Sequence, residues 1–240
     1  MPFSSPIMEL ILFLLYPLAL LRVRLIVPAL LVHGVLIVLS AVSFGRVPLI
    51  GTHDTLGFLA WSIGVVYLIF GWDRKRDLFT WLTVPLVLLL LAGSALSPVM
   101  RGPLPPVLRT IWFELHVILS FLSYALFAVG AVFGILYLSD GAREHETGQY
   151  RSLLLGYALF SLAMIFGGIW AHLAWGTYWL WTPKELWTTI VWFSYSLYLH
   201  ARLVKGWIGR PVAWIGVTGF VIVMFTYMGV GLLMKSSHEF

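Results

Sequence analysis

Residues 170–192 read WAHLAWGTYWLWTPKELWTTIVW and hold six of the twelve tryptophans of this 240-residue chain. An apolar helix can run in as far as about Ala174, and another can start near Pro183, because proline suits the first turn of a helix. The segment between them carries aromatic rings on both sides of Gly176. Flat, rigid rings with few polar groups predict a shelf for a large planar apolar ligand. The alternative is an aromatic belt, since Trp and Tyr are enriched at any membrane–water interface.

The composition of the chain is that of an integral membrane protein. Apolar residues make up 60% and charged residues 10%, whereas a soluble domain carries about 25% charged residues. There is no cysteine, so a metal ligand would have to come from the seven histidines rather than from a thiolate. No positively charged segment precedes the first apolar run, which argues against a cleaved signal peptide.

Eight apolar segments are candidate membrane-spanning helices, because about 20 helical residues cross the hydrocarbon. They are residues 4–21, 25–43, 54–71, 78–96, 111–138, 152–173, 184–203 and 211–234. The first is the weakest, because Tyr16-Pro17 interrupts it. We therefore predict an all-α polytopic integral membrane protein with about eight transmembrane helices, folded as a single domain over residues 1–240.

The distribution of lysine and arginine predicts the orientation in the membrane. One set of connections carries ten of them, namely Arg22, Arg24, Arg74, Lys75, Arg76, Arg143, Arg151, Arg202, Lys205 and Arg210. The alternate set carries five, namely Arg46, Arg101, Arg109, Lys184 and Lys235. Positive residues favour the cytoplasmic side, so the tryptophan-rich loop and the C-terminus should face outward. The same placement explains the net charge of +5 without a nucleic-acid partner.

The stretch from Trp175 to Trp187 resembles the tryptophan-rich, WWD-type signature of the cytochrome c assembly family of haem-handling membrane proteins. The CcsA/ResC branch of that family (System II) reads approximately WGxYWxWDPKExW, and Thr182 stands where the family usually has Asp. The aromatic and glycine positions that match are Trp175, Gly176, Tyr178, Trp179, Trp181 and Trp187. The resemblance covers roughly residues 45–240, and Asp54 matches an acidic residue that follows a Pro-Leu pair in the family's early outward loop.

Three histidines carry further parts of this resemblance. His116 stands in a context like the family's HVxxxxxSY, and His238 follows the last apolar segment, where the family has its second outward histidine. The resemblance implies that these two are axial ligands on opposite sides of one haem iron. His200 resembles the histidine of the family's YLHxR run, which serves an inner haem site. The open alternatives are a backbone or Glu114 partner for His116, an idle tail residue for His238, and an interfacial histidine beside Arg202 for His200.

Two further histidines lie near these features in the sequence. His172 stands one turn before Trp175, where it lines the shelf or, as is more usual for such a histidine, belongs to the core. His33 is a candidate substitute for the second ligand of the inner site.

The remaining polar candidates have weaker signals. His53 could contact the edge of a ligand, whereas His145 lies in a hydrophilic stretch, residues 140–150, that we expect to be a cytoplasmic loop without a special role. Arg101 and Arg109 could meet ligand carboxylates or lipid phosphates. Lys184 and Glu185 either shape the electrostatics of the shelf or cap the following helix.

The resemblance implies a haem-handling subunit of a System II cytochrome c synthase (haem lyase) in the plasma (inner) membrane. Such a subunit moves haem b to the outer face and presents it for thioether attachment to an apocytochrome c carrying Cys-x-x-Cys-His. It also implies a ResB/Ccs1-type membrane subunit as partner, which in the family supplies the second inner ligand. The alternatives are a HemX-type haem-binding regulator or chaperone, and a transporter for another compound.

Overall fold

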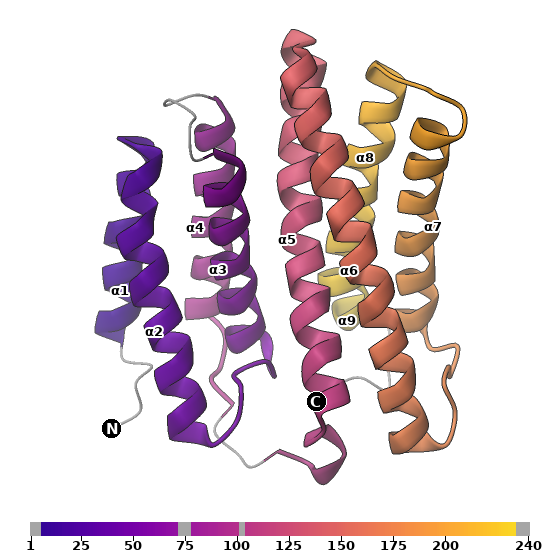
Figure 1. The fold of residues 1–240 in the computed structure, drawn as a ribbon. Helices are drawn as coiled ribbons and strands as arrows, with labels where there is room; N and C mark the ends of the chain where they lie inside the picture. Colours follow the sequence, from indigo (N-terminus) through magenta and orange to yellow (C-terminus); the bar gives the residue numbers. More distant parts are fainter. Residues whose placement is uncertain (1–5, 72–77, 101–103, 234–240) are drawn as a thin grey trace. The chain divides into compact units, whose positions relative to one another are not determined.

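The computed structural model describes residues 6–71, 78–100 and 104–233 of the chain. Every regular element within these ranges is a helix (Figure 1), which confirms the predicted all-α membrane class. The helices separate into two compact units, residues 1–105 and residues 106–240. Each unit is described by itself, and the single domain over residues 1–240 stays a prediction.

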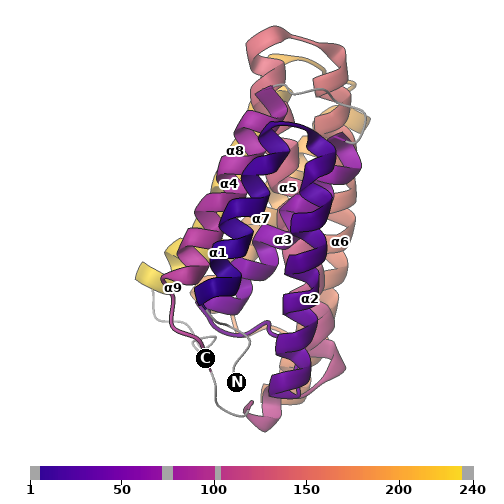
Figure 2. The same cartoon turned by 90° about the vertical axis from the view of Figure 1, so that its left-hand side faces the viewer.

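Unit 1 is a bundle of four helices. They are α1 (Pro6–Leu15), α2 (Ile26–Phe44), α3 (Thr52–Gly71) and α4 (Leu78–Ala95). Successive helices run in opposite directions and pack side by side (Figure 2). The predicted interruption at Tyr16-Pro17 is confirmed, because α1 ends at Leu15 and the chain continues as the 3-10 helix Tyr16–Leu20. A proline ring excludes the hydrogen bond that would continue an α-helix.

Unit 2 is a second bundle, which begins with a 3-10 turn at Pro106–Leu108. Its helices are α5 (Ile111–Asp140), α6 (Arg143–Trp175), α7 (Pro183–Leu203), α8 (Arg210–Met224) and α9 (Val230–Leu233), with a π-helical turn at Phe225–Gly229. The closest pair is α5 and α6. At Gly130 a Cβ atom would lie 2.5 Å from Leu153, so the glycine is what lets these two helices approach.

All eight predicted segments contain a helix, but not all of these helices are long and apolar enough to cross a membrane. Within the described ranges, six helical segments are long and apolar enough to span. They are Val23–Phe44, Thr52–Gly71, Leu78–Ala95, Ile111–Asp140, Arg143–Trp175 and Arg210–Gly229. The segment Leu10–Leu20 is short, and α7 is more polar. The predicted number of eight spanning helices is therefore approximate.

The expected loop over residues 140–150 is wrong. Only Gly141 and Ala142 connect α5 to α6, which begins at Arg143. The following polar residues, rich in Glu, Arg and Gln, are good helix formers, so a helix can continue past its apolar part, where hydropathy no longer marks it. His145 is accordingly buried, with Nδ1 3.1 Å from Oδ1 of Asp140.

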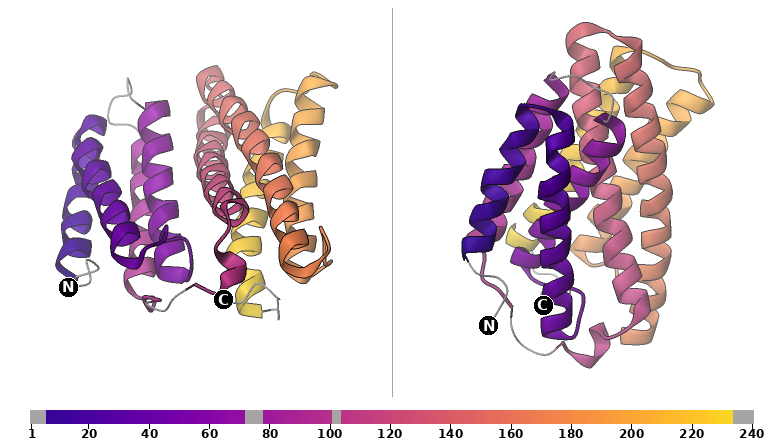
Figure 3. Two further views of the ribbon diagram at one scale, coloured as in Figure 1. Left: turned by 60° about the horizontal axis from the view of Figure 1, so that its bottom comes forward. Right: turned by 60° about the vertical axis from the view of Figure 1, so that its left-hand side comes forward.

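Different loops and helix ends lie at the two opposite ends of unit 2 (Figure 3). At one end lie the loop 176–182, the beginning of α5 and the end of α9, and we call this the aromatic end. At the other end lie the α5–α6 connection, the end of α7 and the beginning of α8. His116 therefore belongs to the aromatic end and His200 to the opposite end, as the sequence predicted.

Candidate functional site

Backbone caps shape the tryptophan-rich loop at both of its ends. Gly176 has a φ of 76° and donates its N–H to the carbonyl of His172 at 2.8 Å, which ends α6. Thr182 is the N-cap residue of α7, and its hydroxyl accepts the N–H of Glu185 at 3.4 Å. Pro183 occupies the first turn of α7, as predicted. The seven residues between the helices thus connect one helix end directly to the next helix start.

Glu185 holds the loop together from inside. The residue is 7% exposed, and its carboxylate accepts the backbone N–H of Thr182 at 2.8 Å and that of Leu180 at 3.0 Å. The hydroxyl of Thr182 also lies 3.2 Å from it. Of the two roles considered for Glu185, these contacts support capping, since a buried carboxylate is stabilised by several donors. Thr182 performs the N-cap role for which Asp is also favoured, so that role survives the exchange.

Two substitutions of Thr182 test its role as the N-cap residue of α7. Thr182→Ala removes the cap acceptor and should lower the stability of the protein by about 1 kcal/mol. Thr182→Asp provides a cap acceptor that Thr182→Ala lacks, but it places a second carboxylate beside Glu185. We therefore expect it to be more stable than Thr182→Ala by less than capping alone would give, because the two carboxylates repel each other. Thermal unfolding in detergent, followed by circular dichroism, measures both. Equal melting temperatures for Thr182→Ala and the unchanged protein would contradict the capping role.

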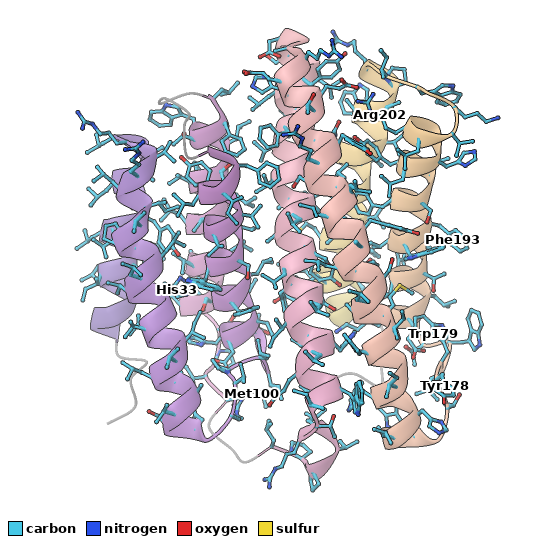
Figure 4. The ribbon with its side chains drawn as sticks, in the orientation of Figure 1. His33, Met100, Tyr178, Trp179, Phe193 and Arg202 are labelled. Carbon is cyan, nitrogen blue, oxygen red and sulfur yellow. The ribbon has the colours of Figure 1, made fainter. Side chains whose placement is uncertain are left out.

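Two rings of the loop, those of Tyr178 and Trp181, are exposed, and the ring of Trp179 is half-buried. Trp181 is 67% exposed and has a φ of 58°, a conformation that costs energy for a bulky residue. Tyr178 is exposed and stacks on His172, with ring centroids 4.4 Å apart and planes 6° from parallel. Figure 4 shows Tyr178 and Trp179 on the loop that joins α6 to α7. His172 is itself exposed, so the expectation of a core histidine is wrong.

Trp170 links the loop to the beginning of α5. It is 2% exposed and donates its indole N–H to the carbonyl of Val107 at 2.8 Å. Its ring meets that of Trp175 edge-on, with centroids 4.9 Å apart and planes at 66°, and is nearly parallel to that of His116 at 6.5 Å. Because its hydrogen bond fixes the ring of Trp170, this ring also fixes the positions of Trp175 and His116 relative to each other.

His116 is held in one orientation by α6. Its Nδ1 lies 2.8 Å from the backbone carbonyl of Ala163. A carbonyl only accepts, so Nδ1 carries the hydrogen and, in the neutral ring, Nε2 keeps its lone pair. This contact bears out the alternative of a backbone partner for His116. It is equally the arrangement found for metal-binding histidines, whose other ring nitrogen donates to a carbonyl or carboxylate.

Two neighbours complete the surroundings of His116. A Cβ atom on Gly167 would lie 2.6 Å from Nδ1 of His116, so only glycine leaves room for the imidazole. The charge of Lys184, in the first turn of α7, also acts on His116.

A π-helical turn closes the aromatic end on the side of α8. The ring of Trp187 lies 4.4 Å from that of Phe225, the first residue of this turn, and Tyr227 contacts Phe121 on α5 at 5.4 Å. Such turns are frequent at functional sites. His238 follows α9 in the sequence and lies outside the described residues. The sequence predicted only an uninterrupted helix here.

His200 lies apart from this site, on an exposed face of α7. The exposed side chains of this face recur every three or four residues and are Leu186, Ile190, Phe193, Leu197 and His200, with Val204 just after the end of the helix. Figure 4 shows Phe193 at the outer side of α7. Arg202, the alternative neighbour considered for His200, is paired with Glu146 of α6.

The remaining candidates fall into different parts of the chain. The side chain of Asp54, in unit 1, is buried, and its carboxylate lies 3.6 Å from the guanidinium of Arg46. Arg109 is exposed, and Arg101 lies outside the described residues.

The fold and this site define a polytopic helical membrane protein with an exposed tryptophan loop beside an oriented histidine. The chain belongs to the cytochrome c assembly protein family, which matches residues 49–238, and the resemblance in the sequence is thereby confirmed.

Its relatives include three proteins that carry the description "cytochrome c biogenesis protein CcsA". The protein of Chlamydomonas reinhardtii is 32% identical over 218 residues, which are 82% of this chain and 61% of the relative. That of Prochlorococcus marinus (strain MIT 9312) is 31% identical over 236 residues, covering 82% of this chain and 76% of the relative. That of Trieres chinensis is 31% identical over 244 residues, covering 82% and 78%. The chain thus spans about three fifths of the Chlamydomonas reinhardtii relative and about three quarters of the other two.

Proposed function

We propose that this chain is the haem-handling subunit of a cytochrome c synthase and that it presents haem b at the aromatic end. The observation that carries this is the orientation of His116, whose Nδ1 is held by the carbonyl of Ala163. The free lone pair on Nε2 suits an iron ligand. Family membership supplies the biological setting, namely cytochrome c assembly.

The tryptophan-rich loop supplies the surface for the porphyrin. The rings of the loop and of the helix ends that flank it, namely Trp175, Tyr178, Trp179, Trp181 and Trp187, stand at the same end of unit 2 as His116. Aromatic faces stack on flat apolar ligands, and Gly176 carries no side chain that would hinder one. In this proposal His238 is the second axial ligand on the opposite side of the iron.

The bound haem is the substrate, and its vinyl groups supply the reactive carbons. Each thiol of the apocytochrome's Cys-x-x-Cys-His adds across one vinyl double bond, with sulfur joining one carbon and the proton reaching the other. The chain's residues bind and orient the haem and need no thiol of their own. The aromatic end must therefore face the compartment that holds the apocytochrome. The distribution of lysine and arginine supports this outward orientation, in the plasma (inner) membrane.

A maturation assay tests this function. The chain is expressed with a ResB/Ccs1-type subunit and a reporter apocytochrome c in cells that lack their own synthase. Covalent haem on the reporter, detected by its peroxidase activity after denaturing electrophoresis, is the expected result. Haem bound to the chain without any attachment to the reporter would overturn the synthase role and favour the HemX-type regulator or chaperone.

A partner subunit fits the exposed face of α7. In the membrane, a histidine among apolar side chains is costly unless it has a partner or a ligand, and His200 is exposed on this face. We propose that the ResB/Ccs1-type subunit packs here and provides the second ligand of an inner haem site whose first ligand is His200.

Removing His200 should affect only the inner site. His200→Ala should lower the haem content of the purified two-subunit complex by about half, if each of the two proposed sites is filled, and should leave the outward haem spectrum in place. His145→Ala is the matched control, since His145 is paired with Asp140 instead. A full haem content in His200→Ala would contradict the inner site without touching the proposal for His116.

A further inference from the structure

Unit 1 contains a cavity that the proposed haem chemistry does not use. It lies among α1, α2, α3 and α4 and has about 620 Å³ of empty space, including the part that opens to its surroundings. Its apolar lining includes Leu12, Phe13, Leu36, Ile37, Phe58 and Leu91. A mostly apolar cavity with a few convergent polar groups is the usual form of a small-molecule site.

His33 is the central polar group of this cavity. The residue lies on α2 (Figure 4) and is 5% exposed. Its Nδ1 is 2.9 Å from the hydroxyl of Tyr16, a pairing that fixes the ring. Within the part of the chain that the structure describes, Nε2 has no hydrogen-bond partner, although His33 lines the cavity. Nε2 is therefore available to a ligand atom in the cavity, and a hydrogen bond to it would strengthen binding.

Gly57 allows a ligand to reach this nitrogen. A Cβ atom there would lie 3.9 Å from Nε2 of His33 and 3.4 Å from the hydroxyl oxygen of Ser94. The two polar groups therefore converge above a backbone position that has no side chain. Ser94 donates its hydrogen to the carbonyl of His53 at 2.7 Å, so its oxygen remains able to accept.

The charges around the cavity favour a neutral ligand. Asp54 is the carboxylate in its lining, and Arg46 balances it at 3.6 Å, with both side chains buried. No net charge is left to recruit an ion. A neutral ring with a carbonyl oxygen suits this site, because Nε2–H of His33 can donate to the carbonyl while the hydroxyl of Tyr16 donates to Nδ1.

We propose that this cavity binds the head group of a membrane-dissolved quinone. The ring occupies the space above Gly57, one carbonyl accepts the hydrogen bond of His33, and the apolar tail leaves through the open side of the cavity. The proposal concerns binding alone and is independent of haem at the aromatic end.

Titration calorimetry of the full chain in detergent with decylubiquinone tests this site. Saturable binding with one site is expected, and decylbenzene, which has the tail but no carbonyl, should not compete. His33→Leu should weaken binding by about tenfold or more, as the loss of a buried hydrogen bond does. Gly57→Ala should weaken it as well, because its methyl group would fill the approach to Nε2.

Two control variants show whether a loss of quinone binding is specific to the cavity. Gly34→Ala, whose Cβ meets Trp61 instead, and His145→Gln should bind as the unchanged protein does. If His33→Leu fails to fold, as judged by gel filtration and circular dichroism, Gly57→Ala decides. No binding by the unchanged protein, equal binding by Gly57→Ala and Gly34→Ala, or equal competition by decylbenzene would overturn the proposal. So would a haem band that His33→Leu or Gly57→Ala abolishes, since the cavity would then be a haem site.

Discussion

His116→Ala should remove most of the haem from the aromatic end and lower cytochrome c maturation by about tenfold or more. The expectation follows from the bond between Nδ1 and Ala163, which leaves Nε2 as the nitrogen available to iron. Alanine keeps the helix and takes away the ligand. Haem content by the pyridine haemochrome method, together with covalent haem on a reporter cytochrome, measures the effect.

Added imidazole distinguishes a lost ligand from a misfolded protein. A small ligand can occupy the space of the missing ring, so imidazole in the growth medium should restore part of the maturation in His116→Ala. His145→Ala, which removes a buried imidazole from the other end of unit 2, should retain full haem. Normal haem content in His116→Ala would exclude His116 as an axial ligand.

Gly167→Ala should reproduce much of the His116→Ala defect without changing any proposed ligand. The added methyl group would lie 2.6 Å from Nδ1 and 2.9 Å from Cε1 of His116, closer than such atoms approach. The imidazole must therefore turn or shift, and its bond to Ala163 weakens. Because ligand position is critical for metal binding, we expect a roughly tenfold loss of haem affinity.

The next residue provides the control. Gly168→Ala lies on the same helix, but its Cβ would find the carbonyl oxygen of Tyr178 at 3.6 Å, which is ordinary contact. Its haem content should match that of the unchanged protein. If both alanine variants lose haem equally, the defect comes from α6 as a whole rather than from the space around His116.

The sequence predicted the helices and the loop because each has a local cause. The apolar runs fix the spanning helices, Tyr16-Pro17 ends α1, and Pro183 opens α7. The prediction was wrong in the polar first turns of α6, where neither hydropathy nor a proline marks the helix. The π-helical turn Phe225–Gly229 was missed, because nothing in its composition distinguishes it from an α-helix.

The orientation of the site residues could not be predicted in the same way. The partner of His116 is a backbone carbonyl 47 residues away, and any residue type could supply it. Gly167 gives a weak signal at best, since its role depends on how α6 faces α5. The exposure of His172 and the partnerless Nε2 of His33 likewise follow from helix packing. Periodicity indicates that a helix exists but leaves its neighbours undetermined.

The optical spectrum of the chain purified with its ResB/Ccs1-type partner from haem-replete cells tests the central claim most directly. The measurement includes the variants His116→Ala and His238→Ala and the double variant. If both histidines bind one haem, each single variant should weaken the same reduced Soret and α bands, and the double variant should lose little more than either. Unchanged bands in both single variants, or no haem in the folded complex, would contradict haem ligation at the aromatic end.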